Sequence, residues 1–378
     1  MTARRAPGRR RGRARRVLGG LLALALLGLV AAAGAAAWAW RRLGTPYQGY
    51  AGAERRVVVA PGEDAGAILA RLAAEGVLRD AALARAYLVL VRDDPPLHAG
   101  EYLFRGPLSP LEVLDKLARG DVVLHTVTVV EGLTLEETAA ALAAAGLGTA
   151  ADFQKAMRDP ARIADLDPEA RDLEGYLFPE TYSFAAATPP VEIVAKLVAT
   201  FRERWRAEVV PLLAGGARPR VSELVTLASI VEEEARLPEE RPLVAAVYAN
   251  RLRRGMGLFA DPTIIFALKR RGAWTGNLRR ADLELDDPYN TYRHAGLPPG
   301  PICSPGAASL RAAARPADVP HLYFVGRNDG SHVFAATLAE HNRNVERWQK
   351  EYWRARWARE RAARTPAAPR RPDGAGGD

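Results

Sequence analysis

The 378-residue chain has one cysteine, Cys303, and only three methionines. One thiol cannot form an intramolecular disulfide, and it excludes a zinc site built from several cysteines. We interpret Cys303 as a small packing residue rather than a nucleophile. The six histidines show neither an HExxH motif nor a short paired spacing, so the sequence predicts no metal site. GxSxG and Walker A motifs are also missing, which leaves α/β-hydrolases and P-loop enzymes without support. We expect no cofactor.

Acidic residues are missing from residues 1–16, which carry eight arginines. Residues 350–378 add a net charge of +4, so residues 17–349 have a net charge of −3 although the whole chain carries +9. A near-neutral body without an aromatic and basic stripe argues against nucleic acid as a partner. The composition of 350–378 predicts a disordered basic tail. A solvated tail is the default, and contact with anionic lipid or wall polymer is the alternative.

Charged side chains are absent from residues 17–40, a run of 24. At about 1.5 Å per residue, a helix of this length spans the roughly 30 Å hydrocarbon core of a membrane. Trp38 and Trp40 lie at its end, where indoles favour the interface, and the arginines before it favour the cytoplasmic side. The sequence therefore predicts a single-pass anchor over 17–40, a cytoplasmic segment 1–16 and an extracytoplasmic body. A signal peptide cleaved within 31–37 is the alternative.

Two further domains are predicted after a linker over residues 41–55. Residues 56–121 read as strand, helix, helix, strand and helix, with Ser109 as a helix cap, which predicts a small α+β module. A generic α+β linker domain fits that pattern equally well. Residues 122–349 predict a larger α+β domain, with strands at 122–130 and 322–326 and helices at 134–145, 191–206, 221–235, 243–254 and 337–356.

The helix predicted over 221–235, with Ser222 as its cap, carries three consecutive glutamates. Its apolar residues fall in one stripe, with Glu232 on one edge, Glu234 on the opposite edge and Glu233 facing solvent. Burial against an apolar wall raises the pKa of a carboxyl group, and a general acid near neutral pH needs such a pKa. A solvated acidic run at a helix end is the alternative interpretation, and it is the likelier one from helical geometry alone.

Two other stretches offer polar groups for a ligand. In the first, Asp261 precedes Pro262 and Thr263, and a helix-capping role for Asp261 is the simpler interpretation. The second is the loop Tyr289-Asn290-Thr291-Tyr292, which continues into Gly296–Gly300. Its aromatic faces and hydrogen-bonding groups are typical of sugar-binding surfaces, but they also occur in ordinary rigid loops.

Several stretches occur together in one order: EGYLFPETY at 174–182, LASIVEEE at 227–234, NRLRRGMGLFADPTI at 250–264 and YNTYRHAGLPPGPICSPG at 289–306. With LYFV at 322–325, they resemble the endolytic murein transglycosylase family, also called YceG-like. The resemblance covers roughly residues 57–342, and that family also has a single membrane anchor. It implies that residues 56–121 form a LysM-like module and that 122–349 form the catalytic domain. It places the chain in the bacterial inner membrane.

The resemblance implies cleavage of the β-1,4 bond between N-acetylmuramic acid and N-acetylglucosamine in nascent peptidoglycan, without water. The muramyl 6-hydroxyl closes a 1,6-anhydro ring, so one carboxyl group can act as acid and then as base. By resemblance Glu232 is that catalytic glutamate. The candidates for substrate binding are Glu234, Asp261, Thr263, Asn290 and Tyr292. Peptidoglycan strands are the implied partner, and a role in ending glycan elongation beside peptidoglycan synthases is a family-level expectation.

Four residues depart from the family's pattern. Phe259-Ala260 stands where glutamine and a hydroxyl residue are usual, Phe266 replaces a tyrosine, and Glu233 replaces a frequent lysine. The lost amide and phenol leave two alternatives open. One is a peptidoglycan-binding scaffold of the same fold with weak or no activity, and the other is a true hydrolase that uses Glu232 with Asp261.

Overall fold

The computed structural model describes residues 9–213 and 219–364. They form two compact units, one containing the residues up to His125 with Ala185–Thr188, and the other containing the rest. The predicted segment 1–16 is described only from Arg9 onward, as the start of a helix.

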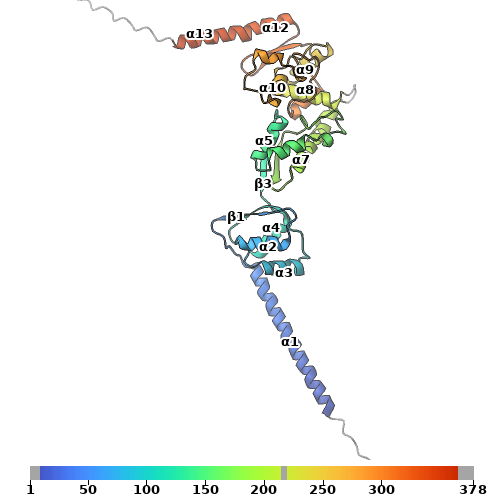
Figure 1. The fold of residues 1–378 in the computed structure, drawn as a ribbon, viewed down its shortest axis with the longest axis vertical. Coiled ribbons are helices and arrows are strands. Elements are labelled where there is room, and N and C mark those ends of the chain that lie inside the picture. The colour runs from blue at the N-terminus through green and yellow to red at the C-terminus, as the bar shows by residue number, and fades with distance from the viewer. Residues whose placement is uncertain (1–8, 214–218, 365–378) are drawn as a thin grey trace, which may run out of the picture. The chain divides into compact units, whose positions relative to one another are not determined.

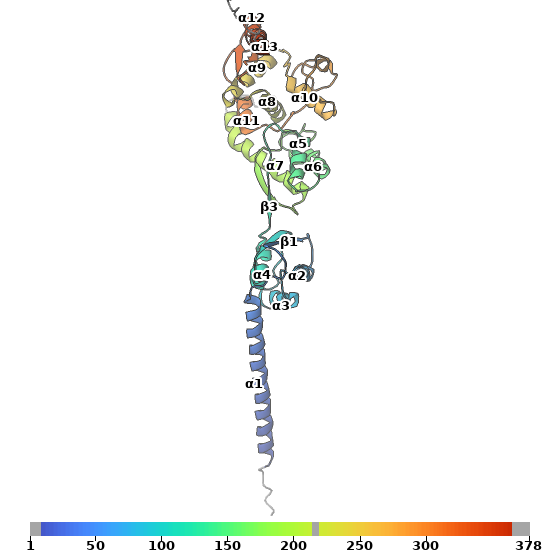
Figure 2. The ribbon, with the colours of Figure 1, turned by 90° about the vertical axis from the view of Figure 1, so that its left-hand side faces the viewer.

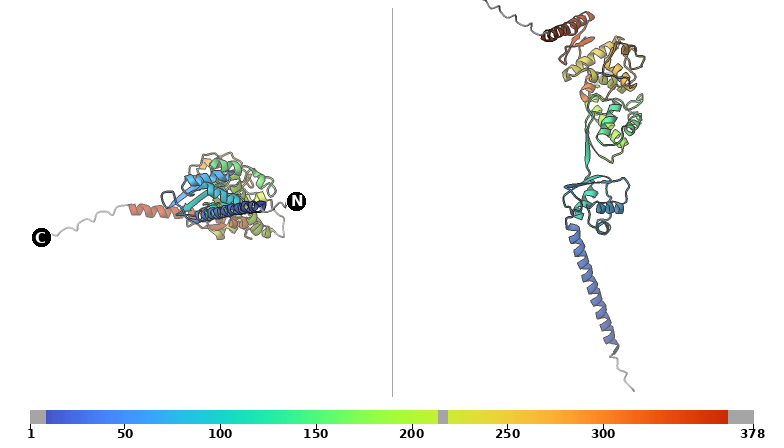
Figure 3. Two further views of the ribbon diagram at one scale, coloured as in Figure 1. Left: turned by 90° about the horizontal axis from the view of Figure 1, so that it is seen from below. Right: turned by 60° about the vertical axis from the view of Figure 1, so that its left-hand side comes forward.

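The N-terminal helix α1 (Arg9–Gly44) is long and uninterrupted (Figure 3). Its stretch Leu18–Gly44 is long and apolar enough to cross a membrane, as residues 17–40 predicted. Leucine side chains along it are exposed, for instance Leu24 at 67% and Leu29 at 67%. An exposed leucine surface of this length needs an apolar environment. A membrane anchor and a signal sequence both meet this description.

The rest of the first unit is a two-stranded sheet packed on three helices (Figure 1). The elements are β1 (Glu54–Val59), α2 (Ala65–Ala74), α3 (Ala81–Val91), β2 (Gly100–Arg105) and α4 (Pro110–Arg119). β1 pairs antiparallel with β2, so that Val57 faces Tyr102. Ser109 caps α4 in a capping box with Glu112. The predicted order of elements over 56–121 is confirmed.

The second unit is mostly helical (Figure 2). Its helices are α5 (Leu135–Ala144), α6 (Ala150–Met157), α7 (Pro190–Arg204), α8 (Val221–Glu234), α9 (Arg241–Arg253), α10 (Asp261–Arg270), α11 (Ala307–Ala314), α12 (Leu338–Val345) and α13 (Tyr352–Arg364). β3 (Leu124–Thr128) pairs with β4 (Thr181–Ala185), and β5 (Tyr323–Gly326) pairs antiparallel with β6 (His332–Ala335). This mixture of helices and small sheets is the α+β class predicted.

Helix α8 is the centre of the second unit. All eight residues from Leu224 to Val231 are buried, and α8 contacts α9, α10 and α11. Its C-terminal turn, which carries the three glutamates, is therefore held on several sides by other helices. This packing fixes the direction in which each carboxyl group leaves the helix.

Four local predictions were wrong. Ser222 does not cap α8, because the helix already begins at Val221 and Arg220 occupies the cap position. Asp261 does not cap α10 either, since it is the first helical residue and Ala260 precedes it. The strand expected over 122–130 is shorter because Val122 turns back onto Gly120. The helix predicted over 337–356 continues to Arg364 as α13, where a disordered tail was predicted, and 365–378 lie outside the described residues.

Candidate functional site

The three glutamates at the end of α8 have different surroundings. Glu232 and Glu234 have no partner in common, which agrees with their predicted positions on opposite edges of the helix. The Glu232 side chain is only 5% exposed. Glu234 is half-buried, and Glu233 is exposed, as predicted. Glu233 nevertheless lines a small cavity with Gly132 and Pro262, and burial raises the pKa of its carboxyl group.

Glu234 has a hydroxyl partner on α9 and a pKa raised to near neutrality. The Tyr248 hydroxyl of α9 donates a 2.8 Å hydrogen bond to its Oε1. Burial raises the pKa of Glu234 to about 7, and the charge of Asp261 adds to that effect. The hydrogen bond from Tyr248 and the charge of Arg251 partly offset it. At neutral pH this carboxyl group can therefore both hold and release a proton.

Asp261 and Tyr292, two of the predicted substrate-binding residues, are in direct contact. The Tyr292 hydroxyl donates a 2.7 Å hydrogen bond to Oδ1 of Asp261. Burial, together with this bond, raises the pKa of the Tyr292 phenol. Because Asp261 also acts on the pKa of Glu234, these three side chains belong to one electrostatic site.

Phe259 adds an aromatic face to this site. Its ring is 49% exposed and lies 5.4 Å from the Tyr292 ring, centre to centre. Its backbone has φ of 50°, in the left-handed region that bulky residues rarely occupy. Arg251 of α9 lies 6.0 Å from the Phe259 ring and 5.5 Å from the Tyr323 ring. Strained backbone of this kind is concentrated at ligand-binding sites.

Glu232 belongs to a different cluster, built around Arg241. Arg241 Nη2 lies 2.7 Å from Glu232 and 3.6 Å from Glu131. The backbone N–H of Gly306 donates to the second oxygen of Glu232 at 2.8 Å. Burial, with the charge of Glu232, raises the pKa of Glu131. Glu232 is thus held in an ion pair that ties α8 to the start of α9.

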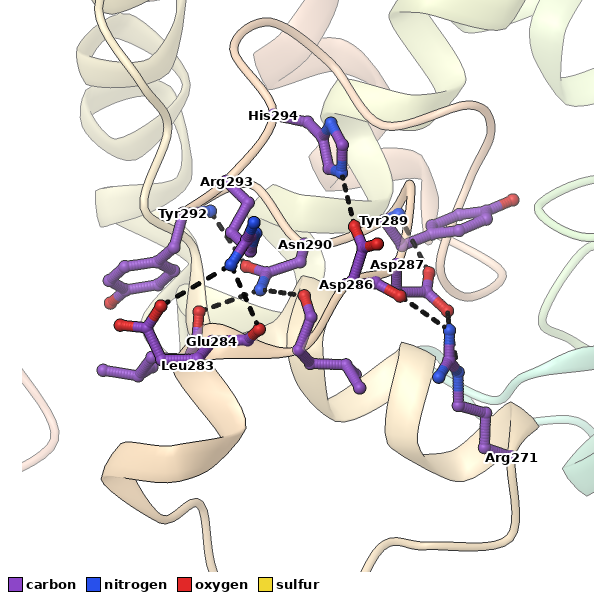
Figure 4. A network of polar contacts seen from close by, with 11 residues as sticks. Arg271, Leu283, Glu284, Asp286, Asp287, Tyr289, Asn290, Tyr292, Arg293 and His294 are labelled. Atoms are coloured by element: carbon purple, nitrogen blue, oxygen red, sulfur yellow. Dashed lines mark hydrogen bonds and ion pairs between the residues drawn. The ribbon is translucent and has the colours of Figure 1, made fainter.

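Thr263 and Asn290 do not fit the substrate-binding role expected of them. Both are fully buried, at 0% exposure. Thr263 donates to the Ala260 carbonyl, and Asn290 donates to the carbonyls of Leu283 and Leu285 (Figure 4). Their polar groups are satisfied inside the protein, so they shape the loops that present Asp261 and Tyr292.

The loop around Asn290 presents two tyrosines in opposite directions (Figure 4). Tyr292 points toward Asp261, whereas Tyr289 packs 4.9 Å from the ring of Phe266. Tyr289 and residues 297–301 line a cavity of about 730 Å³. Glu232 and Glu234 are not among its lining residues within the described chain. The loop predicted to bind sugar therefore contributes side chains to two different surfaces.

Sequence reasoning missed the partners that α9 supplies. Arg241 and Tyr248 lie seven residues apart, so they share one face of this helix. The helix was predicted to begin at Leu243, which left Arg241 outside it. The seven-residue spacing of Arg241 and Tyr248 was the feature of the sequence that could have revealed these partners. Within residues 9–213 and 219–364, no three His, Cys, Asp or Glu side chains are grouped as a metal ion requires.

The comparisons with known proteins identify the family. Residues 57–347 match the model of the YceG-like family, and the chain belongs to that family. The chain is 32% identical over 281 residues to an endolytic murein transglycosylase of Bacillus subtilis (strain 168), covering 69% of this chain and 76% of that protein. It is 29% identical to an endolytic murein transglycosylase of Streptococcus pneumoniae serotype 2, covering 66% of this chain. The chain spans 50% of the length of that streptococcal protein.

One solved structure supports the fold. A putative yceG-like protein from Listeria monocytogenes aligns with 77% of this chain and 98% of its own, with a TM-score of 0.51 and 30% sequence identity. The family match begins at Val57 and ends at Arg347, so α1 and α13 lie outside it.

Proposed function

We propose that this chain is an endolytic murein transglycosylase that cuts the β-1,4 bond between N-acetylmuramic acid and N-acetylglucosamine and leaves 1,6-anhydro ends. The observation that carries the proposal is Glu234, a half-buried carboxyl group with a pKa of about 7 beside Asp261 and Tyr292. The names of the Bacillus and Streptococcus relatives support the same activity.

Glu234 serves first as acid and then as base in this mechanism. Its proton passes to the glycosidic oxygen as the bond to the muramyl anomeric carbon breaks. The muramyl 6-hydroxyl then attacks that carbon, and its proton returns to Glu234. Because the nucleophile belongs to the substrate, a second catalytic carboxylate is unnecessary. The charge of Asp261 lies where it can stabilise the positive charge that develops on the sugar.

We place the acid at Glu234 rather than at Glu232, the residue favoured by resemblance. Glu232 already forms an ion pair with Arg241, and its side chain is 5% exposed. Both carboxyl oxygens of Glu232 already accept hydrogen bonds within the protein, from Arg241 and from the backbone N–H of Gly306. Glu234 accepts a hydrogen bond from the phenol of Tyr248 and has a pKa suited to proton transfer.

The test compares Glu234→Gln with Glu232→Gln on purified peptidoglycan sacculi, using mass spectrometry of the released fragments. We expect Glu234→Gln to lose about 10²–10⁴-fold of the rate at which anhydro ends form. Glu232→Gln should keep a larger share of the unaltered chain's rate and lose thermal stability instead. If Glu232→Gln loses more of the rate than Glu234→Gln, the general acid is Glu232.

Two other outcomes would change the class of activity. Reducing ends in place of anhydro ends would identify a hydrolase. Binding to sacculi without any product from the unaltered chain would identify a scaffold, the reading that Phe259 and Phe266 motivate.

The proposal also covers the cellular location of the reaction and the proteins beside it. Residues 17–40 would anchor the chain in the bacterial inner membrane, with the catalytic unit outside the cytoplasm. Residues 56–121 would form a LysM-like module, and peptidoglycan synthases would be neighbours at the growing strand. Protease protection of the N-terminus in inverted and right-side-out vesicles tests this orientation.

A further inference from the structure

Two cavities in the second unit form one depression beside Tyr289. They measure about 730 Å³ and 340 Å³. Five residues line both of them: Arg171, Asp172, Glu174, Arg270 and Tyr289. Cavities of several hundred Å³ accommodate small ligands or short segments of a polymer. The depression lies on the Tyr289 side of the loop, whereas Tyr292 faces the proposed catalytic site (Figure 4).

The two arginines that line both cavities, Arg171 and Arg270, have no acidic partner among the described residues, whereas Arg220 of the larger cavity is paired. Among the described residues, neither Arg171 nor Arg270 forms an ion pair or donates a side-chain hydrogen bond, and Arg158 in the smaller cavity is in the same state. The guanidinium group of Arg270 lies over the rings of Phe266 and Tyr289, at 5.6 Å and 5.3 Å. Stacking holds this group in place while its N–H donors stay available.

Most acids of the depression have partners within the protein. Glu174 is buried and accepts from the backbone N–H of Leu135. Burial raises its pKa well above the ordinary value. Asp172 accepts from the backbone N–H of Glu174 at 3.0 Å, and in the larger cavity Glu169 and Glu223 are both paired with Arg220. Among the described residues, the unpaired arginines Arg158, Arg171 and Arg270 therefore outnumber Glu136, the acid of the smaller cavity that has no ion-pair or hydrogen-bond partner.

We propose that this depression binds carboxylate groups of the peptides attached to peptidoglycan strands. The proposal rests on the proposed function and names a second contact with its substrate. The sugar rings of the glycan backbone are uncharged, so the peptide carboxylates are the groups that two unpaired guanidinium groups would select. The planar donor fork of arginine matches a carboxylate with two hydrogen bonds. Tyr289 and residues 297–301 supply an apolar wall for the peptide's aliphatic parts.

The experiment measures binding rather than cleavage, using the full chain in detergent with Glu234→Gln to stop turnover. Its ligands are soluble glycan strands with their peptides intact and the same strands after the peptide carboxylates have been converted to neutral methylamides. We expect the intact strands to bind about tenfold more tightly at low salt. Adding Arg171→Gln and Arg270→Gln should remove that difference and leave binding of the amidated strands unchanged.

Matched variants separate charge from packing. Arg270→Lys keeps a positive charge and should restore part of the preference for intact strands. Arg206→Gln, at an exposed position on another surface, should have no effect. Equal binding of both ligands by the starting protein would overturn the proposal. So would an equal loss for both ligands in the arginine variants, or stronger competition by a phosphate polymer than by the free peptide.

Failure of this inference is distinguishable from failure of the proposed function. If the unaltered chain releases no anhydro ends, the catalytic proposal fails while the binding comparison still stands. If anhydro ends form at equal rates from intact and amidated strands, and both bind equally, only the peptide contact is lost.

Discussion

The hydroxyl group of Tyr248 donates a hydrogen bond of 2.8 Å to Glu234, and this bond opposes the effect of burial on the carboxyl group. Seven residues earlier on α9, Arg241 binds Glu232. One face of α9 therefore engages both outer glutamates of the α8 terminus, with a neutral donor at one and a cation at the other. This difference in partner separates the two carboxyl groups chemically, although they are two residues apart.

Replacement of Tyr248 by phenylalanine should move the pH profile upward. The phenol stabilises the ionised form of Glu234, so its loss raises the pKa of a group that already titrates at about 7. The proton donor then survives to higher pH, and we expect the alkaline limb of kcat/KM to shift by roughly one pH unit. An unchanged limb in Tyr248→Phe, with the rate reduced equally at every pH, would contradict the assignment of Glu234 as the acid.

Glu234→Gln should stabilise the fold at alkaline pH more than at acidic pH. The unfolded chain releases the Glu234 proton near pH 4.5, whereas the folded chain retains it up to about 7. Stability from this group is therefore present below pH 4.5 and is lost as the pH rises through 7. The glutamine avoids that loss, which amounts to at most about 3 kcal/mol. Thermal unfolding of both proteins at pH 5 and pH 8 measures it, and an advantage independent of pH would refute the shift.

Arg241→Met should be strongly destabilising, because it leaves Glu232 without its cation at 5% exposure. Loss of one partner of a buried ion pair costs about 3–5 kcal/mol, while removal of both costs much less. The double variant Arg241→Met/Glu232→Gln should therefore recover most of the stability in urea unfolding. Arg220→Ala is the control, since that arginine is 62% exposed and solvent screens its ion pairs, so its loss should change the stability far less. Additive losses in the double variant would show that the pair is not coupled.

Phe259→Gly should increase the stability of the fold and weaken substrate binding. Glycine adopts φ of 50° without the side-chain clash, so we expect a gain of about 1 kcal/mol. Loss of the ring beside Tyr292 should at the same time raise KM for glycan. Asp93→Gly is the matched control, because Asp93 has φ of 56° but lies in the first unit. Asp93→Gly should gain stability without a change in KM. If Phe259→Gly also leaves KM unchanged, the Phe259 ring does not contact the substrate.

Local patterns predicted part of the local structure. Ser109 caps α4 as predicted, and the spacing of α8 placed Glu232 and Glu234 on opposite edges. The same spacing could not distinguish their chemistry, because that depends on Arg241 and Tyr248 of another helix. The contact between Asp261 and Tyr292 spans 31 residues and depends on a loop that buried Thr263 and Asn290 hold in shape. Composition alone also could not predict α13, where arginine and alanine continue as a helix.

Because Cys303 is buried, the rate of its chemical modification reports local opening of the protein around it. This sole thiol is 1% exposed, and it lies against the carbonyl of Ser229 inside α8. Alkylating reagents can reach it only when the packing around α8 separates, so the rate of its modification measures that opening event. Cysteines introduced at the surface would react far sooner, which allows selective attachment of fluorescent dyes without removal of the native sulfhydryl.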